Sequence, residues 1–132
     1  MTRVWWTPSG LVGAGLFRVA LGTSLVVRPA GLAKTVGVDS ATASKVGWLG
    51  SMVGVRDIAL GWGLVHAARR DADPRPWLLA QAASDAVDAA AFTAAVVRGQ
   101  AKPTKTLAIA AFAVLGTLSE LQAYQGLSRA PR

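Results

Sequence analysis

The residues best suited to chemistry in this sequence are charged side chains that interrupt long apolar runs. They are Arg18, Arg56, Asp57, Asp85, Asp88 and Glu120. Counted from the ends of the runs, the first five fall near the middle, whereas Glu120 lies closer to the end of the last run. Carboxyl groups in an apolar site can act as general acids or bases, and arginines can orient and neutralise them. The aligned charges of both signs therefore predict an interior cluster, which is the candidate site.

Asp85 and Asp88 are the predicted acid/base groups of this cluster. Two arginines near the middle of the runs oppose three aspartates, which leaves one negative charge in excess. Surroundings of low dielectric constant disfavour the ionised carboxyl, so we expect one of Asp85 and Asp88 to hold a proton near neutral pH. The competing interpretation is a set of ion pairs that only fixes the register of the helices.

Other site chemistries have less basis in the sequence. A magnesium site built on Asp85 and Asp88 needs more carboxylates than the two arginines leave free. The chain has no cysteine, its one histidine lies at the end of a run, and no reactive-serine motif or glycine-rich phosphate loop is present. Thiolate metal sites and nucleophilic triads are therefore not predicted. We expect neither a metal nor a cofactor.

Four apolar runs have to position these charges, and they cover residues 11–27, 46–68, 77–97 and 107–124. Runs of about 17 to 23 mainly apolar residues are long enough to cross a bilayer. A charge at the bilayer centre costs roughly 3 kcal/mol on insertion scales, so each helix must turn its charged residues toward the other helices. The sequence predicts an all-α fold, a four-transmembrane-helix bundle that forms one multi-pass domain of the cell membrane over residues 1–132.

The segments between the runs lead to three further expectations. Trp5 and Trp6 precede the first run, and adjacent tryptophans at such a position are typical of the headgroup level of a membrane. Residues 30–45 have the apolar spacing of one short interfacial helix between spans 1 and 2. The residues after Gln125 are expected to be disordered.

The basic residues predict the class of partner. The formal net charge is +7, and all of the 14 lysines and arginines except Arg18 and Arg56 lie outside the apolar runs. They form no contiguous patch and no aromatic platform, so nucleic acid is not an expected partner. Anionic headgroups of membrane lipids are the expected counter-charge. Because lysine and arginine are divided equally between the two sides of the predicted membrane, orientation is not predicted.

Two alternatives to four spans are compatible with the pattern. The first is a soluble helical bundle whose polar faces meet water, since alanine-rich segments bearing aspartates are weak transmembrane signals. The second treats the first run as a secretory signal peptide. Arg18 splits the apolar core of that segment and no A-x-A cleavage site follows, so the signal peptide is disfavoured.

Two short motifs carry a family resemblance. Arg56-Asp57-x-x-x-Gly61 in the second run, followed by Ser84-Asp85-x-x-Asp88 in the third, resembles a family of small four-helix integral membrane proteins of unknown function that is common in actinobacteria. The likeness covers most of the chain. It implies a fold rather than an activity, and no functional residues are carried over from the family.

The favoured function is a pocket for a small apolar or lipid-like molecule, lined by the charges, with Arg18 and Arg56 as its anchors. In an enzymatic version Asp85 or Asp88 transfers protons in an isomerase or cyclase reaction. A proton-coupled small transporter is one alternative, and it predicts a homodimer because four short helices enclose little space. A structural partner subunit of a membrane complex is the other.

Overall fold

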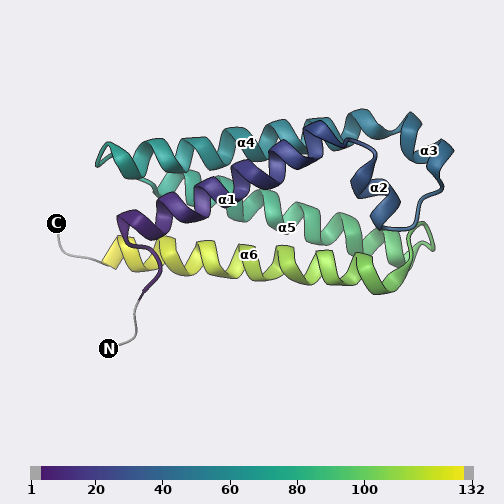
Figure 1. Cartoon of the computed structure of the whole chain (residues 1–132). Helices are drawn as coiled ribbons and strands as arrows, with labels where there is room; N and C mark the ends of the chain where they lie inside the picture. The colour runs from purple at the N-terminus through teal and green to yellow at the C-terminus, as the bar shows by residue number, and fades with distance from the viewer. Residues whose placement is uncertain (1–3, 130–132) are drawn as a thin grey trace.

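The structure is a computed structural model that describes residues 4–129. This part of the chain folds into helices joined by short connections and contains no strand, so the expected all-α class is confirmed. The long helices are α1 (Pro8–Val27), α4 (Gly47–Arg69), α5 (Arg75–Val97) and α6 (Pro103–Arg129). Two short helices, α2 (Gly31–Thr35) and α3 (Ser40–Lys45), connect α1 to α4 (Figure 1). Each predicted apolar run falls almost entirely within one long helix.

Local sequence explains where α1 begins and ends. The Thr7 hydroxyl caps the helix by accepting a hydrogen bond from the backbone N–H of Gly10 at 3.2 Å. Pro8 occupies the first turn, where its missing N–H has no intrahelical partner to lose. Pro29 follows Arg28, the residue that closes α1, and a proline there prevents the helix from continuing. The start and stop of this helix therefore follow from residue type alone.

The segment 30–45 forms two helices rather than the one that was expected. Gly37 adopts a left-handed backbone conformation with φ +92°, which ends α2 and turns the chain. Asp39 then accepts hydrogen bonds from the backbone N–H groups of Ala41 and Thr42 at 3.1 and 3.0 Å, so a new helix begins. The break between the two short helices therefore comes from one glycine and one capping aspartate.

Helix α6 continues to Arg129, so the expectation of disorder after Gln125 is wrong for the residues up to 129; residues 130–132 lie outside the described part. Trp6 explains the extension, because its ring lies so close to Gly126 that a Cβ there would approach it within 2.6 Å. Trp5 and Trp6 pack against a core of four buried residues, Leu11, Leu64, Leu78 and Ala123. Their position at a headgroup level stays a prediction.

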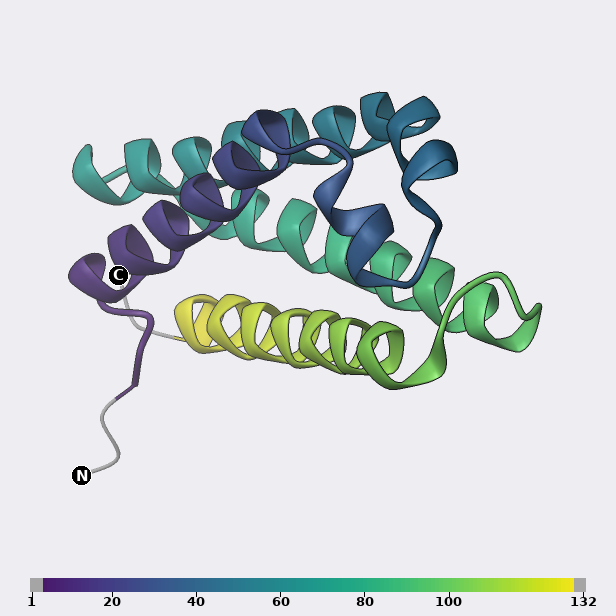
Figure 2. The ribbon, with the colours of Figure 1, turned by 45° about the vertical axis from the view of Figure 1, so that its right-hand side comes forward.

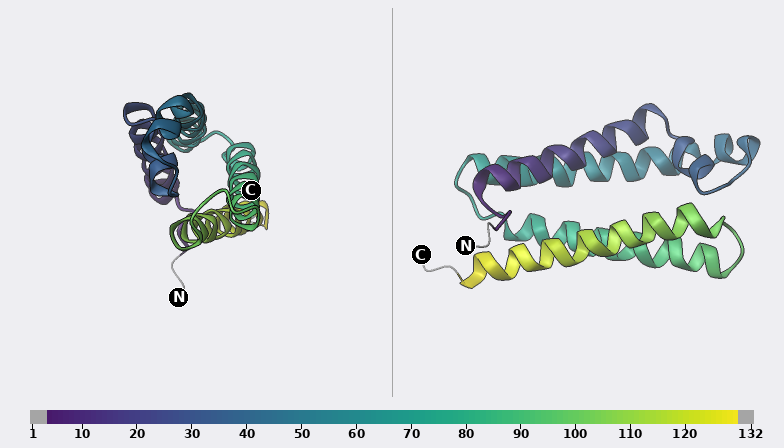
Figure 3. Two further views of the ribbon diagram at one scale, coloured as in Figure 1. Left: turned by 90° about the vertical axis from the view of Figure 1, so that its right-hand side faces the viewer. Right: turned by 60° about the horizontal axis from the view of Figure 1, so that its bottom comes forward.

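The long helices associate as two pairs. Helix α1 packs along α4 and α5 along α6, whereas the pairs make few contacts with each other, as the end-on view of Figure 3 shows. Glycines bring α1 and α4 together: a Cβ on Gly15 would lie within 2.6 Å of the Gly61 carbonyl oxygen, and one on Gly54 within 2.5 Å of the Gly22 carbonyl oxygen. Such close backbone approach through small residues is common between membrane helices.

The outer surface of the bundle is rich in large apolar side chains. Exposed examples on the four long helices are Leu16, Phe17, Trp48, Met52, Val55, Trp62, Val87, Leu115 and Leu118. By length and composition α1 and α6 are apolar enough to cross a membrane. Helices α4 and α5 carry most of the charges that interrupt the runs, and these lower their mean hydropathy. Large apolar side chains are therefore part of the exposed surface of all four long helices.

A pair of glycine variants on α1 tests the α1–α4 contact. We expect Gly15→Ala to lower the free energy of unfolding by about 1–3 kcal/mol, the usual cost of overpacking. Gly13→Ala is the matched control, because a Cβ at Gly13 meets nothing within 4 Å. Replacing glycine by alanine stabilises a helix by up to about 1 kcal/mol through helix propensity, and this gain applies to both variants. Because Gly13→Ala adds no clash, it should be neutral or slightly stabilising. Thermal unfolding in detergent measures both, and equal effects would contradict the close helix contact.

Candidate functional site: a charge cluster beside a cavity

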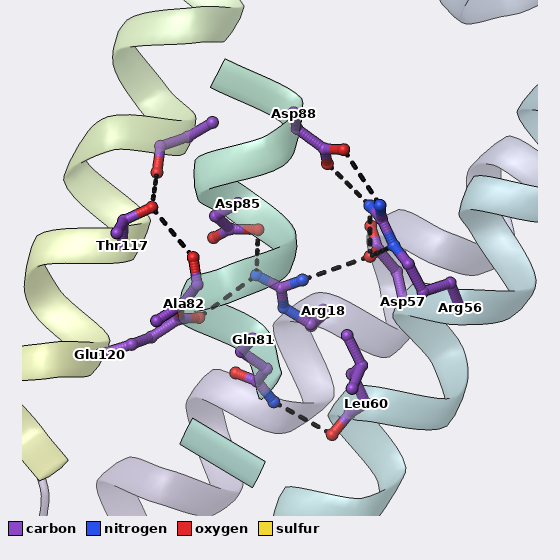
Figure 4. Close-up of polar contacts among 11 residues, drawn as sticks. Arg18, Arg56, Asp57, Leu60, Gln81, Ala82, Asp85, Asp88, Thr117 and Glu120 are labelled. Atoms are coloured by element: carbon purple, nitrogen blue, oxygen red, sulfur yellow. Dashed lines mark hydrogen bonds and ion pairs between the residues drawn. The ribbon is translucent and has the colours of Figure 1, made fainter. Parts of the chain in front are cut away.

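The four long helices bring their charged residues together in the interior of the bundle (Figure 4). Arg18 comes from α1, between the two glycine contacts with α4. Arg56 and Asp57 come from α4, two aspartates one turn apart from α5, and a glutamate from α6. The charge cluster consists of Arg18, Arg56, Asp57, Asp85, Asp88 and Glu120.

Arg18 connects α1 to the other three long helices. Its Nη1 donates to Asp57 Oδ1 at 3.2 Å, and its Nη2 donates to Asp85 Oδ1 at 2.5 Å and to Glu120 Oε1 at 3.2 Å. The arginine side chain is only 11% exposed. Because its acceptors lie on α4, α5 and α6, this single guanidinium joins the two helix pairs.

Arg56 forms a second link, between α4 and α5. Its Nη1 and Nη2 donate to the two carboxylate oxygens of Asp88 at 3.0 and 2.7 Å, which is a bidentate arrangement. Its Nε and Nη2 also donate to Asp57 Oδ1 at 3.3 and 3.2 Å, so this oxygen bridges Arg56 and Arg18. The Arg56–Asp88 pair is more exposed than the contacts of Arg18, at 32% and 25% of the side-chain surface.

The sequence predicted that both arginines pair with aspartates on other helices, and these contacts confirm it. The sequence also placed Glu120 away from the middle of the bundle but within the charge cluster, and its contact with Arg18 agrees with this. Gly116 of α6 lies directly against Asp85, so Glu120 is one helical turn from that level, and its long side chain spans the difference. With Glu120 included, four carboxylates face two guanidinium groups. The formal excess is therefore two negative charges instead of one.

Several carboxylate oxygens in the charge cluster have no hydrogen-bond donor. Asp88 uses both oxygens, whereas Asp57 and Asp85 each accept through Oδ1 alone, among the residues that the structure describes. Glu120 accepts through Oε1, and its Oε2 is buried without a partner in the same part of the chain. A buried acceptor left unpaired costs about 1–3 kcal/mol. The cluster can therefore accept further hydrogen bonds.

A cavity of about 620 Å³ lies between the helix pairs. This volume falls in the range of about 300–1,000 Å³ that is usual for small-molecule sites. Five of the six members of the charge cluster, all except Arg56, contribute to its wall. The rest of the wall is largely apolar and includes Phe17, Leu21, Leu25, Phe92, Ile109 and Phe112. Leu32 of α2 also lines the cavity, so the short connecting helix helps to enclose it.

Two phenylalanine side chains line the cavity from α1 and α6, two helices whose ribbons stand apart in Figure 2. Phe17 and Phe112 line the cavity, their ring centroids are 6.3 Å apart, and they are 55% and 57% exposed. Helices α1 and α6 make few backbone contacts with each other. This side of the cavity therefore depends on side chains rather than on tightly packed helices.

Two residues that position the charge cluster were not among the predicted site residues. Gly116 leaves room for Asp85 Oδ2, because a side chain at 116 would collide with that oxygen. Gln81 is almost fully buried, and its Nε2 donates to the Leu60 carbonyl oxygen of α4 at 3.0 Å. Gln81 shares a helical face with Asp85, and that spacing is the pattern that could have identified it.

Within residues 4–129, no group of three or more histidine, cysteine, aspartate or glutamate side chains is arranged to hold a metal ion. Asp85 and Asp88, the two carboxylates considered for magnesium, accept hydrogen bonds from different arginines. Their geometry is that of ion pairs between helices.

Comparison of the chain with family models, curated proteins and solved structures finds no match. The resemblance to small four-helix membrane proteins of actinobacteria therefore stays a prediction. The case for a functional site rests on the charge cluster and the cavity themselves.

A double-mutant cycle on Arg56 and Asp88 tests whether the partners are energetically coupled. Arg56→Met leaves Asp88 without its bidentate donor, and we expect a loss of about 1–3 kcal/mol of unfolding free energy. Combining it with Asp88→Leu should restore much of that loss, because no stranded charge remains. Thermal unfolding in detergent measures each variant.

The control for this cycle is Arg75→Gln, which breaks an exposed ion pair with Asp73 that is 2.8 Å long. Exposed pairs contribute about 0–1 kcal/mol, so the control should change little. Strictly additive effects of the Arg56 and Asp88 substitutions would show that the two side chains do not stabilise each other.

Proposed function

We propose that the protein is a four-span integral membrane protein whose interior cavity binds a small lipophilic molecule. The observation that carries this proposal is the distribution of polarity: the charge cluster faces the interior while large apolar side chains cover the outside. Paired charges in the interior reduce the cost of placing α4 and α5 in lipid, although their mean hydropathy is modest. Each of the four long helices also has the length that a span requires.

The composition of the cavity wall supports a lipophilic ligand. Aromatic and aliphatic side chains make up most of it, and its polar residues are the five lining members of the charge cluster together with Ser24, Gln81 and Ser119. Such a wall accommodates an apolar body and orients one polar end. In a four-span arrangement Phe17 and Phe112 face the acyl chains, so the ligand would enter sideways from the bilayer.

The contacts favour different roles for the arginines and the carboxylates than the sequence suggested. Arg18 and Arg56 direct their donors to carboxylates, so we propose that they hold the carboxylates in place rather than anchor the ligand. If the cavity supports proton transfer, Asp85 is better suited than Asp88. One oxygen of Asp85 is free of hydrogen bonds among the described residues, whereas Arg56 binds both oxygens of Asp88.

Single cysteines test the four-span arrangement, and the natural chain has no cysteine to interfere. We expect Ala72→Cys and Ser128→Cys to react with a hydrophilic maleimide from one side of the membrane and Gln100→Cys from the other. Val55→Cys and Val87→Cys replace side chains that are 59% and 64% exposed. Lipid should protect both from the maleimide until the protein is unfolded in SDS.

Rapid labelling at positions 55 and 87 in native membranes would indicate a soluble bundle and overturn the proposal. Release of the protein from membranes by alkaline carbonate would do the same. Labelling of positions 72 and 100 from the same side would leave the protein in the membrane but contradict four spans.

A photoreactive alcohol tests the binding site. We expect a neutral long-chain alcohol with a diazirine in its alkyl chain to label the cavity wall saturably in the detergent-solubilised protein, with peptides mapped by mass spectrometry. Leu21→Trp should fill part of the cavity and reduce this labelling severalfold. Leu16→Trp is the matched control, because Leu16 lies on the same helix, is 44% exposed and does not line the cavity. Labelling that is confined to the outer surface would remove the proposed binding function.

A further inference from the structure

We propose that the cavity selects lipophilic molecules that carry a positively charged ammonium group. This inference rests on the proposed function, because it requires that the cavity bind a lipophilic molecule at all. It adds the chemical class of the ligand and the end of the ligand that meets the charge cluster. Three independent features of the cavity wall lead to it.

The first feature is the balance of charge. Four carboxylates, on Asp57, Asp85, Asp88 and Glu120, face the two guanidinium groups of Arg18 and Arg56, so the charge cluster is formally two negative charges in excess. Charges interact more strongly in a cavity of low dielectric constant than in water. A ligand with one positive charge reduces the excess, whereas an anionic ligand increases it.

The second feature is the supply of hydrogen-bond acceptors. Asp57 and Asp85 line the cavity and each has an oxygen without a donor among the described residues. Asp85 Oδ2 lies against Gly116, which has no side chain that could donate a hydrogen bond to it. The guanidinium groups are already occupied by carboxylates, so the charge cluster offers acceptors rather than donors. An ammonium group supplies the N–H donors that these oxygens lack.

The third feature is the aromatic part of the wall. Phe17, Phe92 and Phe112, from three different helices, line the same cavity as the carboxylates. The face of an aromatic ring attracts a cation, and the attraction is greater where water is excluded. The rings are also compatible with the apolar body of the ligand, so the wall suits a molecule with both features.

Protons are the alternative way to neutralise the excess charge. If two carboxyls of the charge cluster hold protons permanently, the cavity has no net charge and gains nothing from a cationic ligand. The two possibilities differ in one measurable property, the preference of the cavity for a cation over a neutral molecule of the same chain length.

Competition against the photoreactive alcohol measures this preference. Dodecylammonium, dodecanol and dodecanoate are compared at equal mole fractions in a neutral detergent at pH 7. We expect dodecylammonium to displace the probe at about a tenfold lower mole fraction than dodecanol, equivalent to about 1.4 kcal/mol. Dodecanoate should compete least. This comparison uses the unaltered protein and does not depend on the folding of any variant.

Glu120→Gln is the variant that tests the origin of the preference, because it removes one negative charge from the charge cluster with little change of shape. We expect it to reduce the advantage of dodecylammonium over dodecanol severalfold. Asp71→Asn is the matched control: it removes one negative charge from the turn after α4, where Asp71 is exposed and outside the cavity. The control should keep the full preference.

The outcomes separate the two proposals. If no probe labels the cavity saturably, the binding function itself fails. If the probe binds but dodecanol or dodecanoate competes as well as dodecylammonium, the binding function stands and selection of cations is wrong. A preference for dodecylammonium that survives Glu120→Gln unchanged would also overturn it, since the preference would then arise outside the charge cluster.

Discussion

The hydrogen bonds of the Arg18 guanidinium are the interaction on which the rest of the structure depends. Glycines hold α1 against α4, and α5 packs along α6, but the two pairs touch each other little. Arg18 reaches from the first pair to carboxylates on both helices of the second, with Asp85 and Glu120 as its acceptors. The pairs are joined by charges near their middle, by the hydrogen bond from Gln81 to the Leu60 carbonyl oxygen and by a small apolar core at one end. A cavity lies between them.

Joining helices through buried ion pairs requires the removal of charges from water, and the same charges give the site its chemistry. Charges removed from water must find partners, and both arginines do so across helices. The carboxylates outnumber the arginines, however, and oxygens of Asp57, Asp85 and Glu120 receive no hydrogen bond in the described part of the chain. If the charges served only to fix the register of the helices, equal numbers of positive and negative side chains would be enough. The surplus acceptors beside an apolar cavity are therefore the feature that most favours a ligand site.

The sequence predicted what depends on spacing along one helix, and it missed what depends on how helices meet. The four long helices, and the inward face shared by Asp85 and Asp88, follow from helical periodicity and from the cost of charge in apolar surroundings. The contact between Glu120 and Arg18 depends on the register of α6 against the other helices, and the cavity depends on the spacing of two helix pairs. Neither is encoded in a local pattern. The division of residues 30–45 was missed because the left-handed backbone of Gly37 outweighed the apolar spacing around it.

The most direct test of this account measures distances between the helix pairs with and without Arg18. Spin labels on Leu16→Cys and Leu115→Cys report the separation of the pairs, and labels on Leu16→Cys with Val55→Cys report the separation within the α1–α4 pair. We predict that Arg18→Met broadens and lengthens the first distance distribution, measured by electron–electron double resonance in detergent, and leaves the second unchanged. An unchanged distance between the pairs in a folded Arg18→Met variant would show that Arg18 does not join them.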